Sequence, residues 1–348
     1  MPTATTTAAP GADTVSALVR DHLRSQVVAI DRDGLYPGDF LRRLGAAGGL
    51  VGPGRTDDLG PALRTMAEVS ETCGTTGFCL WCQNTSAWYL ANTANSGLRE
   101  RHFAAVGAAR RLGGTALSNP MKHYARFEPL KLAGTPVPGG YAVSGTLPWV
   151  SNLGPDHAFG LVFATPAGTA AAYVTCDRPG LELKRTAAFA ALEGTATFAL
   201  RFDRFFVAES ELLAEPAEPF VRQVQAGFLL LQLGLGFGLI RGAQRDLIGC
   251  ELPAVAEEIA AAVAPLAAQA SALATTPLEP APDYLQRVLR LRLATAELAL
   301  RATQTAAVGS GARGFLATAA PQRRLREALF FSILTPSLRH LHRLLATD

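Results

Sequence analysis

Apolar side chains recur every three or four positions over the first third of the chain, from about residue 13 to residue 111. The clearest instances are Val15, Leu18, Val19 and Leu23, followed by Leu63, Met66 and Val69. This spacing is typical of helices that bury one face. A longer apolar helix is predicted over residues 75–91, and it carries Phe78, Trp81, Cys82 and Trp88. The pattern therefore predicts an N-terminal helical domain over residues 13–112.

The pattern changes to short alternating runs between residues 113 and 207. The runs are 127–133, 141–145, 159–164, 171–175 and 197–202, and Pro and Gly residues separate them. Alternating apolar and polar side chains bounded by turn residues are typical of strands with one buried face. We expect a single antiparallel β-domain over residues 113–210, folded as a small barrel or sandwich.

Helical spacing returns after residue 219. The predicted helices are 220–249, 254–274, 283–308 and 321–332, and a last helix runs to Leu345. In this last helix, Thr335 is the expected N-cap and Pro336 the first helical residue. Residues 219–348 are therefore expected to form a C-terminal helical bundle. The fold class is α+β, with a β-domain between two helical regions.

Composition and charge exclude several classes of protein. The formal net charge is +3, and no run of five or more Lys or Arg residues occurs, so we expect no nucleic-acid partner. Residues 1–12 lack a basic start and an apolar stretch, which indicates an unstructured tail and not a signal peptide. The apolar run 228–240 is too short to span a bilayer and contains three glycines. We expect a buried helix there and a cytoplasmic protein without a membrane segment.

The five cysteines predict neither a disulfide framework nor a metal site. Their number is odd, and Cys79 and Cys82 have C-x-x-C spacing inside a helical pattern without a second pair or a His cluster. Packing cysteines are the simpler interpretation.

The segment Gly-Thr-Leu-Pro-Trp-Val-Ser-Asn at 145–152 carries the most specific chemical signal. In an extended chain, residues i and i+2 project to the same side. Trp149 and Ser151 can therefore face one flat ligand, with the indole stacking and the hydroxyl hydrogen-bonding. A flavin isoalloxazine is such a ligand. The alternative is an ordinary strand with a half-buried core Trp.

Together with two other segments, this motif resembles the acyl-CoA dehydrogenase superfamily of flavoproteins, including its flavin-dependent monooxygenase branch. The resemblance covers residues 15–345. Gly114–Pro120 stands where the family has its aromatic-Cys-x-Thr-Glu-Pro segment, and Trp149–Asn152 matches its Trp-Ile-Thr/Ser-Asn. Arg326-Glu327-Ala328, after a Gly-rich break, matches its Arg-Asp-Ala helix.

The resemblance implies a cofactor and its ligands. Leu117 and Ser118 would bond the pyrimidine edge of FAD, Trp149 would pack on the ring system, and Ser151 would bond near N5. Arg323 and Arg324 could bind a flavin phosphate of a neighbouring subunit, although structural ion pairs explain them equally well. FMN or a diffusible reduced flavin is an alternative to tightly held FAD. A homodimer or homotetramer, a small-molecule substrate and a flavin reductase or electron-transfer partner are implied as well.

The chain also departs from the family's dehydrogenases. Their catalytic Glu lies nine residues after the helix Arg, which here is Thr335, and the alternative base position falls near Phe228, with no carboxylate between residues 220 and 245. The monooxygenase branch often has a His eight residues after that Arg, and here it is Leu334. Residues 121–124 replace the Gly-Ser-Asp that helps hold a CoA thioester. The family's Arg-x-x-Phe-Gly loop is replaced by residues 251–253.

These departures favour an oxygenase or oxidase acting on a small organic substrate over fatty-acid β-oxidation. Removing an α-proton from a thioester requires a base, whereas an oxygenating flavin mainly requires a site that excludes water. A thioester dehydrogenase with a relocated base and a non-catalytic subunit remain alternatives. His123 is a weak candidate for an acid or base, and its alternative is a solvated loop His. His340 and His342 indicate a mostly solvated helix face.

Overall fold

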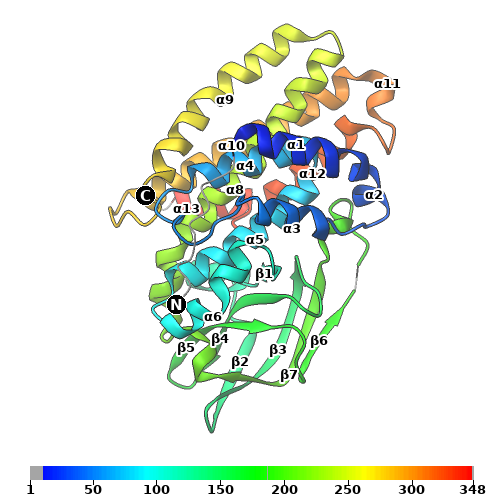
Figure 1. The fold of residues 1–348 in the computed structure, drawn as a ribbon. Helices are drawn as coiled ribbons and strands as arrows, with labels where there is room; N and C mark the ends of the chain where they lie inside the picture. The colour runs from blue at the N-terminus through cyan, green and yellow to red at the C-terminus, as the bar shows by residue number, and fades with distance from the viewer. Residues whose placement is uncertain (1–10, 186, 347–348) are drawn as a thin grey trace.

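The computed structural model describes residues 11–185 and 187–346 and shows a helical body with a β-sheet packed beside it (Figure 1). The N-terminal helices are α1 (Ala12–His22), α2 (Val27–Arg32), α3 (Gly38–Ala46), α4 (Gly60–Thr72), α5 (Gly74–Asn92) and α6 (Ser96–Gly107). The helical interpretation of this region is confirmed. The predicted tail lies outside the described residues as far as residue 10, and Ala12 already begins α1.

The sheet holds eight strands, with the hydrogen-bonded order β6-β7-β3-β2-β4-β5-β8. The strands are β1 (Gly113–Thr115), β2 (Leu132–Val137), β3 (Gly140–Val150), β4 (Ala158–Thr165), β5 (Gly168–Thr175), β6 (Leu181–Lys184), β7 (Phe198–Ala208) and β8 (Leu212–Ala214). Most pairs are antiparallel, as predicted, but β1 and β2 each pair with β4 in parallel. The pattern also missed the short helix α7 (Ser118–Tyr124), which follows β1.

The C-terminal helices match the predicted segments. They are α8 (Ala217–Gly249), α9 (Pro253–Ala274), α10 (Tyr284–Gly309), α11 (Gly311–Gly314), α12 (Ala320–Ile333) and α13 (Leu338–Leu345). The prediction of Thr335 as the cap of the last helix is wrong. The N-cap is Ser337, whose side chain accepts a hydrogen bond from the backbone of His340.

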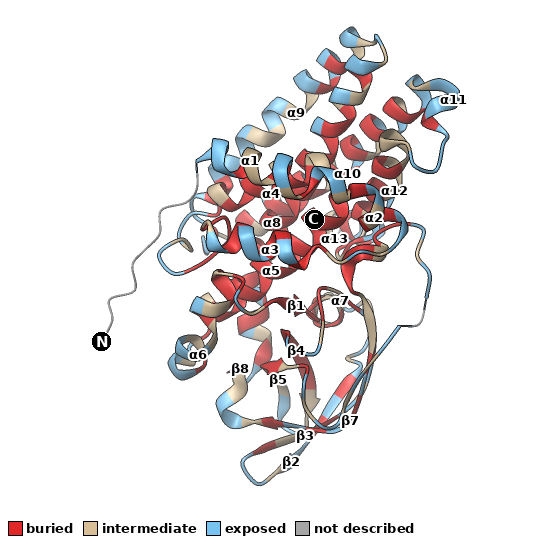
Figure 2. Ribbon diagram, turned by 45° about the vertical axis from the view of Figure 1, so that its right-hand side comes forward, coloured by how far each residue is buried: buried red, intermediate tan, exposed pale blue. Residues whose placement is uncertain are grey.

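Helix α8 forms the centre of the helical body. Within the described chain it alone is long and apolar enough to pass for a membrane span, yet 89% of its most apolar window is buried inside the protein. Figure 2 shows α5 and α8 buried along most of their length, whereas much of α9 is exposed. These two helices are therefore core elements, and the buried helix expected at residues 228–240 is confirmed within α8.

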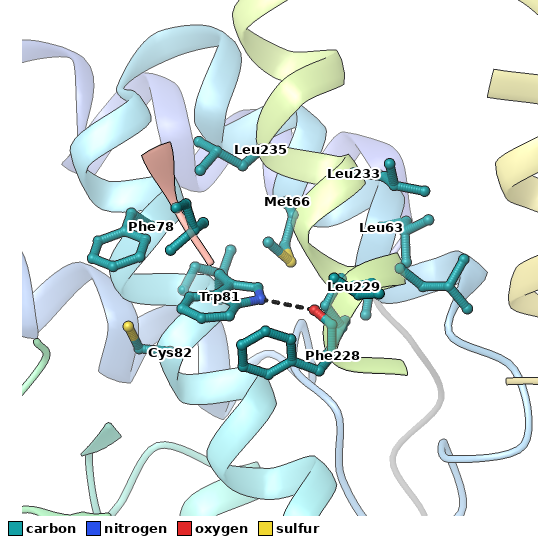
Figure 3. Packing of buried hydrophobic residues seen from close by; sticks show 14 of the residues in the cluster. Leu63, Met66, Phe78, Trp81, Cys82, Phe228, Leu229, Leu233 and Leu235 are labelled. Carbon is teal, nitrogen blue, oxygen red and sulfur yellow. Dashed lines mark hydrogen bonds between the residues drawn. The ribbon is translucent and has the colours of Figure 1, made fainter. Parts of the chain in front are cut away.

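Aromatic side chains fill the space between α5 and α8 (Figure 3). The Trp81 ring stacks on Phe78 at 5.4 Å and meets Phe228 edge to face at 4.9 Å between centroids. Its indole N–H donates to the Phe228 carbonyl at 3.2 Å. Cys79 and Cys82 are buried free thiols of the same helix, and burial raises the pKa of both. They behave as packing residues.

Candidate functional site

Asn152 fixes the end of β3 on which the candidate flavin residues lie. Its backbone adopts a φ of 61°, a conformation that Asn tolerates better than most residues. Its side-chain amide donates to the Gly113 carbonyl at 2.7 Å, and its side-chain oxygen accepts from the Tyr36 hydroxyl at 2.6 Å. The last residue of the Trp-Val-Ser-Asn motif therefore ties the N-terminal helices, β1 and β3 to one another.

His157 supports the same junction and makes it sensitive to acid. Its Nδ1 lies 3.0 Å from the Asn152 carbonyl, and burial lowers the pKa of the imidazole, more than the bond to Asn152 and the nearby Asp156 raise it. Folding thus disfavours protonation of His157, whereas the unfolded chain protonates it near its ordinary pKa of about 6.5.

We therefore expect the folded state to lose stability as the pH falls from about 6.5 through the lowered pKa of His157. Above pH 6.5 both states carry a neutral ring, so this contribution is fully present. Thermal melts at pH 7.5 and 5.5 should show a smaller acid-induced loss in His157→Gln than in the wild-type protein. His342→Gln, at an exposed position, is the control, and an equal loss in all three proteins would contradict the assignment.

Trp149 is exposed, which makes the interpretation as a half-buried core residue wrong. Its side chain is 66% exposed, because the pairing of β3 with β7 shifts register between Leu147 and Val150. Phe189 approaches it edge to face with ring centroids 6.5 Å apart. An indole face is thus displayed beside the anchored strand end, as a stacking ligand requires.

Ser151 stands next to this indole and is linked to a row of hydroxyl groups. Its Oγ lies 2.6 Å from Thr197 Oγ1, which lies 2.7 Å from Thr195 Oγ1. The Thr195 hydroxyl donates to the Leu192 carbonyl at 2.7 Å. Ser151 is only half-buried, so a ligand can reach the outer end of this row.

Leu117 and Ser118 lie at the junction of β1 and α7. The Leu117 side chain is buried, and its backbone N–H donates to Thr115 Oγ1 at 3.2 Å. Thr115 is held in turn by Tyr89 at 2.7 Å. Ser118 is half-buried and begins α7. The assignment of Leu117, Ser118, Trp149 and Ser151 to flavin binding stays a prediction.

Neither position that family dehydrogenases use for their base carries a carboxylate here, because one is Thr335 and the other falls near Phe228. Gln232 of α8 donates to the Thr335 carbonyl at 2.8 Å. Arg292 of α10 donates to Gln232 at 2.7 Å and to the Phe331 carbonyl at 2.6 Å. Arg292 is fully buried, and burial lowers its pKa to about 9. The groups linked to Thr335 are therefore a neutral amide and, behind it, a buried guanidinium.

The three histidines considered in the sequence, His123, His340 and His342, lie in different surroundings. His123 is half-buried, with its ring 5.2 Å from that of Tyr124. His342 is exposed, but the interpretation of His340 as solvated is wrong, because it is only 7% exposed and stacks on Phe127 at 4.5 Å. Burial and the charge of Arg339 lower the pKa of His340. Phe127 lies more than 200 residues earlier, which explains why helix periodicity gave no sign of this contact.

Arg323 and Arg324 point into the protein. Arg323 pairs with Glu327 at 3.6 Å and donates to the Thr72 carbonyl at 2.9 Å. Arg324 pairs with Asp246. Both guanidiniums are nearly buried, so neither is accessible to a phosphate in this subunit. The alternative that they form structural ion pairs accounts for both. Arg326 is engaged as well, with Asp31 at 2.6 Å.

Solved structures share the fold of the whole chain. Butyryl-CoA dehydrogenase from Megasphaera elsdenii superposes with a TM-score of 0.87 at 14% sequence identity, covering 96% of this chain and 96% of that chain. Glutaryl-CoA dehydrogenase from Mycobacterium smegmatis gives 0.80 at 16% identity, covering 96% and 92%. Dibenzothiophene monooxygenase from Paenibacillus sp. A11-2 gives 0.81 at 18% identity, covering 96% and 95%.

No protein-family model matches the sequence, and no curated protein matches it. The chain has the fold of the acyl-CoA dehydrogenases, a fold that these dehydrogenases share with a monooxygenase. The resemblance drawn from three short motifs is thus confirmed at the level of the fold.

Proposed function

We propose that the protein is a flavin-dependent oxidoreductase that binds FAD against β3. The observation that carries this proposal is the exposed Trp149 beside the half-buried Ser151, on a strand end that Asn152 fixes. An exposed aromatic ring offers a flat apolar face on which a planar ligand can stack. Bound FAD supplies two-electron chemistry and, once reduced, reactivity toward oxygen. Trp149 would cover the ring system, and Ser151 would hydrogen-bond its edge.

Isothermal titration calorimetry tests this proposal directly. Oxidised and reduced FAD, and oxidised and reduced FMN, are titrated anaerobically into the purified protein. We expect binding of at least one form, and a weaker signal in Trp149→Ala. If none of the four ligands binds, the proposed function is wrong.

Within this class, we propose oxygenation or oxidation of a small organic substrate in place of thioester desaturation. Thr335 and Gln232 cannot accept an α-proton at neutral pH, and the buried Arg292 behind them disfavours a second cation and favours negative charge. An oxygenase also needs a source of electrons, which a flavin reductase in the cytoplasm would supply, whereas an oxidase would take its electrons from the substrate.

Anaerobic addition of butyryl-CoA or glutaryl-CoA to the flavin-loaded protein separates the two chemistries. A dehydrogenase would transfer electrons to the flavin and bleach its absorbance near 450 nm. We expect no bleaching, because neither base position carries a carboxylate. Rapid bleaching by either thioester would favour the dehydrogenase alternative and a base elsewhere in the site.

We also propose that the protein forms a homodimer or homotetramer through residues 220–348. Large apolar side chains are exposed there: Ile248, Val308, Phe315, Leu316, Leu329 and Ile333. Leu329 and Ile333 lie one turn apart on α12 and form a continuous apolar strip. Exposed strips of this kind are typical of subunit contacts.

Light scattering should therefore give a multiple of the 36.6 kDa chain mass at micromolar concentration. The double variant Leu329→Asp and Ile333→Asp should shift the mass toward that of a monomer. Phe206→Asp, at an exposed apolar position of the β-sheet, is the control and should not change it. A monomeric wild-type protein would contradict the proposal.

A further inference from the structure

The row of hydroxyl groups behind Ser151 has one direction of donation. A hydroxyl carries a single hydrogen, and a carbonyl oxygen can only accept. Thr195 therefore uses its hydrogen on the Leu192 carbonyl, 2.7 Å away. The 2.7 Å bond between Thr197 and Thr195 must then be donated by Thr197. The 2.6 Å bond between Ser151 and Thr197 must in turn be donated by Ser151.

The backbone holds this row in register. The Asn152 N–H donates to the Thr195 carbonyl at 2.8 Å, and the Leu153 N–H donates to the Ala196 carbonyl at 3.2 Å. Thr195 is buried, so water does not compete for its hydroxyl. The inner end of the row is thus fixed at the Leu192 carbonyl. This carbonyl determines which hydroxyl donates in each of the other hydrogen bonds of the row.

We propose that Ser151 is a hydrogen-bond acceptor in the cofactor site, and that the site therefore binds reduced flavin more tightly than oxidised flavin. This inference rests on the proposed function and on the resemblance that sets Ser151 near the flavin N5. Oxidised N5 offers only a lone pair, whereas reduced N5 carries an N–H. The Ser151 oxygen has free lone pairs but no free hydrogen, so it matches the reduced form. Bonding oxidised N5 would break the bond from Ser151 to Thr197.

The expected preference for reduced over oxidised flavin is small but measurable. A neutral hydrogen bond made in one state and missing in the other corresponds to a ratio of dissociation constants of roughly threefold to tenfold. For a two-electron couple, a tenfold ratio raises the midpoint potential by about 30 mV.

The test measures FAD binding in both redox states and the midpoint potential of bound against free FAD, under anaerobic conditions. Wild-type protein should bind reduced FAD more tightly and raise the potential. In Thr195→Val, Thr197 loses its inner acceptor and can donate to Ser151, which frees the Ser151 hydrogen for oxidised N5. The ratio of the dissociation constants for oxidised and reduced FAD, and the rise in midpoint potential, should therefore both become smaller. Thr195→Ser restores the hydroxyl and should restore both values.

Thr305→Val, at a half-buried position of α10, is the control and should leave the ratio of the two dissociation constants unchanged. If Thr195→Val does not fold, Thr197→Val removes the same row at a half-buried position. Equal or tighter binding of oxidised FAD by the wild-type protein would overturn the inference while leaving flavin binding intact. An unchanged ratio in the threonine variants would overturn it as well. Absence of flavin binding in every state would instead reject the proposed function.

Discussion

Replacing Trp149 with Ala should weaken flavin binding by several-fold or more and leave the melting temperature of the flavin-free protein nearly unchanged. The indole is 66% exposed, so the variant loses little buried apolar surface, and surface substitutions usually change stability by less than about 0.5 kcal/mol. Against a bound ring system, an aromatic contact contributes roughly 0.5–1.5 kcal/mol beyond area burial. Fluorescence titration with FAD and thermal melts of the apoprotein measure the two effects separately.

Trp88 offers a matched control within the same chain. It is fully buried in α5, and its indole N–H donates to the Val224 carbonyl at 3.0 Å. Trp88→Ala should cost about 3–5 kcal/mol of stability. The milder Trp149→Phe should melt normally and bind flavin more weakly, or alter its fluorescence. A lowered melting temperature with unchanged flavin binding would show that Trp149 supports the fold and does not contact the cofactor.

The helices could be predicted because their signal is local. Residues 75–91 and 220–249 are apolar over several turns, and the structure encloses both segments as α5 and α8. Elements of three to seven residues, such as β1, α7 and β6, escaped notice because so few positions carry no measurable period. The parallel pairings of β4 depend on how distant segments meet, which alternation within a strand does not report.

The cap of the last helix shows why local chemistry can mislead. Thr335 followed by Pro336 has the residue types of a helix start. Ser337, two residues later, is an equally good cap and is the one used. The Thr335 carbonyl instead accepts a hydrogen bond from Gln232, which lies about a hundred residues earlier in the chain and is invisible to a local pattern.

The candidate site was predictable in its residue types and not in its geometry. Sequence placed Trp149 and Ser151 at a strand end, but the exposure of the indole depends on an irregular pairing with β7. The direction of the Ser151 hydroxyl depends on Thr195 and Thr197, which lie more than 40 residues away. The cationic surroundings of Thr335 depend on Arg292, which no motif singled out.

Replacing Glu327 with Gln should destabilise the protein by about 3–5 kcal/mol. Glu327 is buried on α12, where its Oε1 accepts from the Thr75 backbone at 3.1 Å and pairs with Arg323. A carboxylate at the start of α5 also faces the positive end of the helix dipole. Glutamine keeps the shape and removes the charge, so the buried Arg323 guanidinium loses its ion-pair partner on the same helix. Urea unfolding of the flavin-free protein measures the loss as a shift in midpoint at constant m-value.

The exposed pair of Glu218 and Arg222, also four residues apart on a helix, is the control. Glu218→Gln should change stability by no more than about 0.5 kcal/mol, because solvent screens the pair. α12 leads directly to Thr335. Even so, Glu327→Gln should reduce flavin binding only in proportion to the fraction of unfolded protein. Equal stability losses in the two variants would mean that the buried Arg323–Glu327 ion pair does not stabilise the docking of α12.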